Sequence, residues 1–197
     1  GMTIAEYAQM INGEKWLKNG IQCTLKIVPL KSYDRKAIYP LPVAPSPNLP
    51  NMTAVNLYPS LCFFEGTNIS MGRGTQWQFQ IYGSPKLEKT AFTFTPKPNA
   101  GDKNPKYNGK VCYGEDLSHT PILSTLNLSW LIKAYEQTSA VKVNFFSSSF
   151  DKLAGNKTLK EQLLQHKSEK EIKASWQDAL EKFRKTRKKY LLYPSDF

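Results

Sequence analysis

Glu65 and Arg73 are the residues whose types and surroundings best suit chemistry, and each lies beside a glycine turn. Glu65 follows the apolar block 57–64 and precedes Gly66, so we expect its carboxyl group to be partly buried. Burial raises the pKa of a carboxyl group, as a general acid requires. Two alternatives stay open, in which Glu65 binds or orients a substrate, or accepts hydrogen bonds from the amides of the following turn and locks it.

Arg73 stands between two glycines, so few side chains compete for the space around its guanidinium. A planar guanidinium binds a carboxylate with paired hydrogen bonds, which predicts recognition of an acidic ligand group. Asn68 and Thr75 lie in the same two turns and are candidates to hydrogen-bond that ligand. The alternative is that Arg73 pairs with Glu65 and only braces the two turns.

A second group of candidates lies in the proline-rich stretch 39–50, YPLPVAPSPNLP. Prolines fix the backbone and reduce the entropy lost on binding, so Ser46 and Asn48 could point into a cleft. A turn role for Asn48 is the alternative. Further on, Trp77 and Tyr82 could stack on a sugar ring, although aromatic residues of an alternating strand more often belong to the core.

The elements that must position these residues begin with an N-terminal helix and strand. Thr3 and Glu6 have the spacing of a capping box, which predicts a helix that starts directly after Thr3. Residues 23–30, CTLKIVPL, alternate between apolar and polar side chains and predict a strand. The prolines of residues 39–50 exclude a helix or a central strand, so an ordered loop is expected there.

Several short elements are expected in the rest of the chain. The patterns predict strands over 77–82, 91–95 and 111–117, an exposed loop over 96–107, helices over 124–135 and 157–165, and a break over 151–155.

The C-terminal helix carries an apolar stripe, Ile172, Trp176, Ala179, Leu180 and Phe183, which is expected to pack on a sheet. The element order predicts a single α+β domain, with a mixed or antiparallel sheet packed by N-terminal and C-terminal helices and with long ordered loops.

The amino-acid composition limits the kinds of binding partner to be expected. Of the 197 residues, 27 are Lys or Arg and 16 are Asp or Glu, which gives a net charge of +11 and favours polyanions, anionic surfaces or acidic ligands. The densest basic run, 182–189, shares a helix with the apolar stripe and lacks interleaved exposed aromatics. We therefore expect a solvated face and no nucleic-acid partner.

The sequence also gives no indication of a metal site, a nucleotide cofactor or a membrane span. Three cysteines and two histidines (His119 and His166, expected at the surface) are too few and too scattered for a metal site, so no metal is expected. No Walker loop or complete dinucleotide fingerprint occurs, and no cofactor is expected. No stretch is apolar enough for a membrane span, and the first residues do not form a signal peptide.

The central motifs together resemble one family. They are PSPNLP at 45–50, YPSLCFFEGTNIS at 58–70 and GRGT at 72–75, accompanied by GMTIAE at 1–6, FDKLAGN at 150–156 and KKYLLY at 188–193. This set resembles the NamZ-like exo-β-N-acetylmuramidases, glycoside hydrolases of peptidoglycan turnover that were long described only as a domain of unknown function. The resemblance covers nearly the whole chain and is least distinctive over 96–110.

The resemblance implies a division of labour. Residues 1–197 resemble the C-terminal domain of a two-domain hydrolase, whose N-terminal Rossmann-like domain would be the partner across a cleft and would carry the catalytic carboxylates. Cell-wall fragments with muramyl sugars would be the substrate, and the lactyl carboxylate of N-acetylmuramic acid would be the group that Arg73 recognises. The isolated chain would then be inactive, and the protein would be periplasmic or secreted. A non-catalytic module that binds cell-wall sugars is the alternative.

Overall fold

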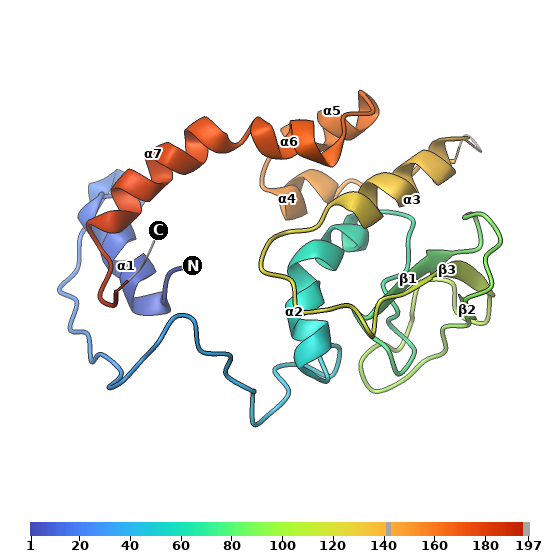
Figure 1. The fold of residues 1–197 in the computed structure, drawn as a ribbon, viewed down its shortest axis with the longest axis horizontal. Helices are drawn as coiled ribbons and strands as arrows, with labels where there is room; N and C mark the ends of the chain where they lie inside the picture. Colours follow the sequence, from blue (N-terminus) through green and yellow to red (C-terminus); the bar gives the residue numbers. More distant parts are fainter. Residues whose placement is uncertain (141–142, 195–197) are drawn as a thin grey trace. The chain divides into compact units, whose positions relative to one another are not determined.

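A computed structural model describes residues 1–140 and 143–194 (Figure 1). Its α-helices are α1 (Ile4–Gly13), α2 (Met52–Leu61), α3 (Ser129–Ala140), α4 (Phe150–Ala154), α5 (Thr158–Leu164), α6 (Glu169–Ala174) and α7 (Gln177–Lys188). The short 3-10 helices are η1 (Lys18–Gly20) and η2 (Cys62–Gly66), and the strands are β1 (Ile81–Ser84), β2 (Thr93–Phe94) and β3 (Cys112–Asp116).

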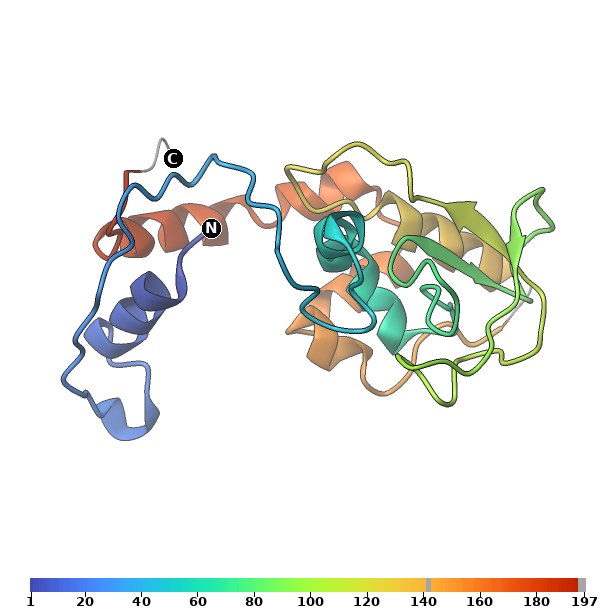
Figure 2. The same ribbon diagram turned by 90° about the horizontal axis from the view of Figure 1, so that it is seen from below.

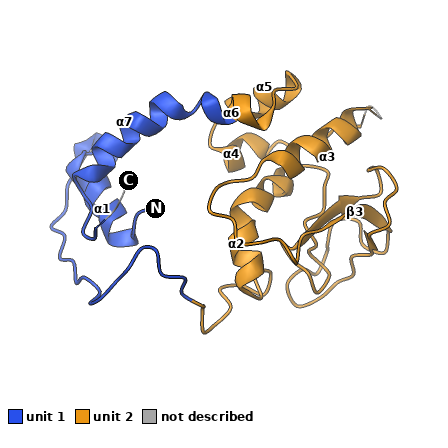
Figure 3. Cartoon of the chain, viewed as in Figure 1, with its two compact units in different colours: residues 1–39, 173–197 blue, residues 40–172 orange. Residues whose placement is uncertain are grey.

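The chain divides into two compact units (Figure 3). Unit 1 combines Gly1–Tyr39 with Lys173–Phe197, and unit 2 is Pro40–Ile172. The α+β class and the antiparallel sheet are confirmed. The terminal helices depart from the prediction, because α1 and α7 both belong to unit 1 and the sheet belongs to unit 2. Of the apolar stripe expected against a sheet, Leu180 and Phe183 instead line a pocket together with side chains of α1. Ile172 belongs to α6 and is buried in unit 2.

The predicted capping box opens α1. The Glu6 amide donates to Thr3 Oγ1 at 3.3 Å, and the Thr3 amide donates to Glu6 Oε2 at 2.8 Å. At the other end of α1, Lys189 Nζ and the Tyr190 hydroxyl both donate to Glu14 Oε1 at 2.9 Å. These bonds tie the N-terminal helix to the residues that follow α7.

Glu6 is fully buried and joins three segments of unit 1. It forms an ion pair with Arg35 and accepts a hydrogen bond from the Leu192 amide at 2.8 Å. Burial alone would raise the pKa of Glu6, but the Thr3 and Leu192 amides and the Arg35 guanidinium outweigh it and lower that pKa to about 2.

Residues 23–30 do not form the predicted strand. They run as a plain trace in Figures 1 and 2 and have no ladder to another described residue. Their alternating pattern suits a strand, but a strand also needs a hydrogen-bonded neighbour, and the described part of unit 1 offers none.

The sheet of unit 2 has the strand order β1-β3-β2, and both pairs are antiparallel. Ile81 pairs with Asp116 in register, and Phe94 pairs with Cys112. Ile81, Phe94 and Cys112 form a buried apolar cluster on one side of this sheet. The strand expected over 77–82 begins only at Ile81, because 77–80 forms a turn closed by a hydrogen bond from the Gln80 amide to the Trp77 carbonyl.

Helix α2 and the helical turn η2 form the apolar support beside the sheet (Figures 1 and 2). Phe64 in η2 stacks on Tyr82 in β1, with ring centroids 5.0 Å apart, and both rings are buried. This contact fixes the end of η2, and Glu65 follows Phe64 directly.

The remaining helices of unit 2 differ in part from the sequence-based expectations. The predicted helix over 157–165 is α5, whereas the helix expected from residue 124 begins at Ser129 as α3. The predicted break at 151–155 is the short helix α4, which ends at Gly155 in the left-handed conformation with φ 77°.

Candidate substrate-binding site

The residues predicted to do chemistry meet a pocket of about 220 Å³ in unit 2. Three segments build it: the end of η2, the turn 70–74, and the loop 96–107. Its lining residues are Glu65, Ser70, Met71, Arg73, Asp102, Asn104 and Lys106.

Arg73 lies between two carboxylates. Its Nη1 is 3.5 Å from Glu65 Oε2, and its Nε is 3.0 Å from Asp102 Oδ2. The side chain is 34% exposed, so these pairs are partly shielded from water. The expected pairing of Arg73 with Glu65 is therefore present, and Asp102 adds a second anion that the motif did not indicate.

Two carboxylates compensate the charge of the Arg73 guanidinium, but one of its hydrogen-bond donors lacks an aligned acceptor in the part of the chain that the structure describes. Nε is buried and has no aligned acceptor within the described residues, although Asp102 is close enough for an ion pair. A buried donor without an aligned acceptor costs free energy. The partly exposed Arg73 side chain could meet a planar acidic group that enters the pocket, and a guanidinium binds such a group with paired hydrogen bonds.

Lys106 binds backbone carbonyl groups on both sides of Glu65. Its ammonium group donates to the carbonyl oxygens of Thr67 and, at 3.0 Å, Ile69. A weaker contact of 3.5 Å reaches the Phe64 carbonyl. Burial of the ammonium group, with Arg73 acting in the same direction and Glu65 opposing, lowers the pKa of Lys106 to about 8.

Glycine is required at two positions of the adjoining turn. Gly72 has φ 80°, and a Cβ there would lie 2.5 Å from the Trp77 carbonyl oxygen. Gly74 has φ 79°, and a Cβ there would lie 2.6 Å from the Pro105 ring. Left-handed backbone and close packing together restrict both positions to glycine, so the turn that presents Arg73 is fixed by its sequence.

Asn68 and Thr75 do not line this pocket. Asn68 Nδ2 donates to the Asn144 carbonyl at 2.8 Å, and the Asn68 amide donates to the Phe145 carbonyl at 2.8 Å. The Thr75 hydroxyl donates to the Gly72 carbonyl at 2.6 Å and accepts from the Trp77 amide at 3.0 Å. In this structure both side chains shape the turns beside Arg73.

Ser46 and Asn48 also lie outside the pocket lining, but Asn48 contacts the loop that contributes Asp102. The Asn48 amide donates to Ser46 Oγ at 3.2 Å, which gives Asn48 the turn role left open by the sequence. Its side-chain Nδ2 donates to the Gly101 carbonyl at 2.8 Å. The proline-rich segment therefore buttresses the residue next to Asp102.

Asp102 and Lys106 were missed because the sequence of the loop 96–107 indicated only an exposed connection. The loop is ordered by its own polar side chains: Asn99 Oδ1 accepts from the Asp102 amide at 2.9 Å, and Asp102 Oδ1 accepts from the Asn104 amide at 3.0 Å. Asn and Asp at such short spacing are typical of self-bonded turns. That signal could have marked this loop as ordered.

The structure also places the aromatic residues and histidines that the sequence singled out. Tyr82 is buried and donates to Glu115 at 2.6 Å, whereas Trp77 is 48% exposed and offers a face for stacking. His119 and His166 are exposed, as expected.

Among the described residues, no cluster of His, Cys, Asp or Glu could hold a metal ion. No helix within the described ranges is long and apolar enough to cross a membrane.

Comparison with known proteins connects this architecture to one family. The family model described as exo-beta-N-acetylmuramidase NamZ, C-terminal, matches residues 56–193, and the corresponding N-terminal model matches residues 1–53. A relative from Bacillus subtilis (strain 168), the peptidoglycan beta-N-acetylmuramidase NamZ, is 34% identical, over 98% of this chain and 50% of the relative.

Solved structures agree. A DUF1343 family protein from Bacteroides fragilis NCTC 9343 is 42% identical with a TM-score of 0.91, over 100% of this chain and 56% of that protein. A second DUF1343 family protein from this organism, 18% identical with a TM-score of 0.77 over 98% of this chain and 56% of its own, shares the fold. This chain thus spans about half the length of these relatives. The chain belongs to the NamZ family, as the central motifs indicated.

Proposed function

We propose that this chain contributes a substrate-binding wall to a peptidoglycan exo-β-N-acetylmuramidase that removes terminal N-acetylmuramic acid from cell-wall fragments. The rest of the active site, including the catalytic carboxylates, would come from a partner domain that corresponds to the part of the relatives that this chain does not span. Because the substrate is cell-wall material, the protein would act in the periplasm or outside the cell.

The observation that carries this proposal is the state of Arg73. Its side chain lines a pocket and is 34% exposed, and the buried Nε of its guanidinium has no aligned acceptor among the described residues. The lactyl carboxylate of N-acetylmuramic acid is a planar acceptor of the kind that a guanidinium binds best. Glu65 and Asp102 would then keep the guanidinium in place before the sugar arrives, which lowers the entropy lost on binding.

Glu65 has two roles open within this proposal. It lies 3.5 Å from Arg73, which supports orientation of that side chain. It also lines the pocket, so a role as the general acid stays a prediction. A Glu65→Gln variant separates the two roles, because loss of a general acid lowers kcat by about 100-fold or more, whereas loss of an orienting partner acts mainly on KM.

The deciding experiment measures release of 4-nitrophenol from a muramyl chromogenic substrate. We expect no turnover by this chain alone, and turnover once the remaining part of a family protein is added. In the combined protein, Arg73→Ala should lower kcat/KM for the muramyl substrate by about 10- to 100-fold, the effect of losing a hydrogen bond to a charged group. Lys110→Ala, an exposed position in the same unit, is the matched control.

Two results would contradict the proposal. Turnover by the isolated chain would overturn the division of labour between the domains. An undiminished preference of the Arg73→Ala protein for muramic acid over glucosamine disaccharides would overturn the role of Arg73.

A non-catalytic cell-wall-sugar binding module is the second candidate. It is favoured by the pocket around Arg73, where Glu65 and Asp102 can position a ligand-binding guanidinium without taking part in a reaction. If this function is correct, the chain alone should bind muramyl disaccharides, measured by calorimetry, and addition of the remaining part should produce no turnover.

A further inference from the structure

Unit 1 contains a segment that has the composition of a strand and lacks a sheet. Residues 21–30, IQCTLKIVPL, alternate between apolar and polar side chains as strands do. Within the described chain, the backbone hydrogen bonds of this segment involve only its two ends. The Ile21 amide donates to the Lys18 carbonyl at 3.4 Å, the Cys23 amide and carbonyl bond the Asn12 side chain, and the Leu30 amide donates to the Tyr193 hydroxyl. The backbone groups of 24–28 are left for water or for a partner.

The side chains of this segment point to the same conclusion. Ile21 is 59% exposed, Val28 is 83% exposed and Leu30 is 66% exposed. Apolar side chains beside unpaired backbone groups resemble the open edge of a sheet, which proteins normally cover or pair. The segment is therefore suited to pair with the edge of another sheet.

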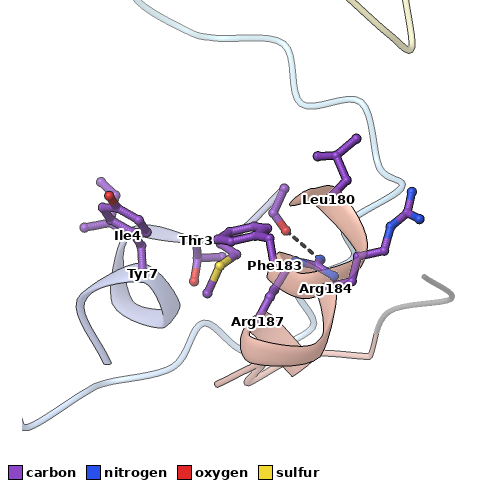
Figure 4. A pocket seen from close by; sticks show the side chains of 9 residues that line it. Thr3, Ile4, Tyr7, Leu180, Phe183, Arg184 and Arg187 are labelled. Carbon is purple, nitrogen blue, oxygen red and sulfur yellow. Dashed lines mark hydrogen bonds between the residues drawn. The ribbon is translucent and has the colours of Figure 1, made fainter. Parts of the chain in front are cut away.

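An apolar pocket of about 600 Å³ lies in the same unit, between α1 and α7 (Figure 4). Ile4 and Tyr7 contribute from α1 and are 91% and 51% exposed. Leu180 and Phe183 contribute from α7 and are 38% and 39% exposed. Figure 4 shows these side chains with Arg187, which donates to the Gly1 carbonyl at 2.8 Å and links the two walls. Apolar side chains exposed together on neighbouring helices are suited to contact a partner.

The comparisons indicate what covers this surface. Residues 1–53, which include the unpaired segment and α1, match the N-terminal family model. The relatives are about twice as long as the stretch that this chain matches. A domain divided between two polypeptide regions leaves a strand and an apolar helix face uncovered in each part, which is what unit 1 displays.

We propose that residues 21–30 add as a strand to a β-sheet in the part of the family protein that this chain does not span, and that the α1–α7 pocket receives apolar side chains from that same part. The partner is thus a polypeptide with an open sheet edge and an adjoining apolar ridge. This inference deepens the proposed function by naming the docking surface, but its test needs neither a sugar nor turnover, so the two can fail separately.

The test uses the part of the 42% identical Bacteroides fragilis protein that this chain leaves uncovered as the probe. Calorimetry should give a dissociation constant of about 10 μM or tighter. Hydrogen exchange should then show protection of alternate amides within 24–28, since only every second amide of an added strand faces its neighbour. Equal protection of all amides within 24–28, or protection of none of them, would overturn strand addition.

Variants identify the surface. Val28→Asp in the segment and Ile4→Asp in the pocket should each weaken binding by about tenfold or more, a change of about 1.4 kcal/mol. Both positions are exposed, so the variants should fold, which circular dichroism checks. Ile122→Asp, at a 67% exposed apolar position of unit 2, is the matched control and should bind like the parent chain.

Other occupants of the surface would give different results, and each would overturn the proposal. Self-association of the chain that Val28→Asp abolishes would assign the surface to a second copy. Equal weakening by Ile122→Asp would show unspecific adhesion. Absence of binding with all variants folded would leave the docking surface without its partner.

Discussion

Replacing Lys106 by Met tests whether the backbone beside the pocket depends on a buried ammonium group. The Lys106→Met side chain keeps an unbranched apolar stem of similar length, but it cannot donate to the carbonyls of Thr67 and Ile69. Hydrogen bonds to a charged group contribute about 1.5–3 kcal/mol each, so two of them contribute about 3–6 kcal/mol.

An opposing effect must be subtracted. A pKa lowered from 10.5 to about 8 means that the ammonium group is disfavoured in its site, by about 3 kcal/mol. The variant escapes this cost. The difference is about 0–3 kcal/mol, so we expect Lys106→Met to lower the free energy of unfolding by about 1.5 kcal/mol.

Urea unfolding followed by tryptophan fluorescence measures this change as a shift in midpoint at constant slope. Lys103→Met, an exposed position of the same loop, is the control and should change stability by less than about 0.5 kcal/mol. If Lys106→Met is as stable as the parent chain or more stable, burial of the ammonium group outweighs its hydrogen bonds, and the reasoning is refuted.

Two further perturbations address the backbone and the charges. Gly72→Ala should cost more stability than Gly109→Ala in urea unfolding, because both residues have a left-handed φ but only a Cβ at Gly72 would meet a backbone atom, at 2.5 Å; equal costs would contradict the close packing of the turn. Glu6→Gln should lower stability by about 2 kcal/mol at neutral pH. Since the pKa of Glu6 is lowered from 4.5 to about 2, the stabilisation by its carboxylate is present above about pH 4.5 and is lost as the pH falls toward 2. The two proteins should therefore converge in that range, and a gap in their urea midpoints that stays constant from pH 6 to pH 2 would argue against the network around Glu6.

The sequence predicted the parts of the fold that depend on local chemistry. The capping box at Thr3 and Glu6 and the strand around Cys112 follow from neighbouring residues, and both are present. The strand at 23–30 was wrong because its formation depends on a neighbour elsewhere, which no local pattern reveals. Similarly, the stripe of α7 indicated an apolar contact without indicating that α1 would be the other wall.

The sequence likewise predicted only part of the candidate site. Glu65 and Arg73 stand out by sequence because Glu65 precedes a glycine and Arg73 lies between two, and they meet in one pocket. Asp102 and Lys106 reach that pocket from residues about thirty positions further on, through contacts that only the folded chain defines. Whether these four side chains bind a muramyl sugar stays a prediction for the variants described above.

The division of unit 1 between both ends of the sequence has a consequence for biosynthesis. Glu6 accepts a hydrogen bond from the Leu192 amide, so it acquires this partner only after the residues up to Leu192 have left the ribosome. Residues 40–172 can fold as a unit during translation, since domains generally do so in the order of their synthesis. Until α7 emerges, the apolar side chains of α1 that line the pocket lack their opposite wall.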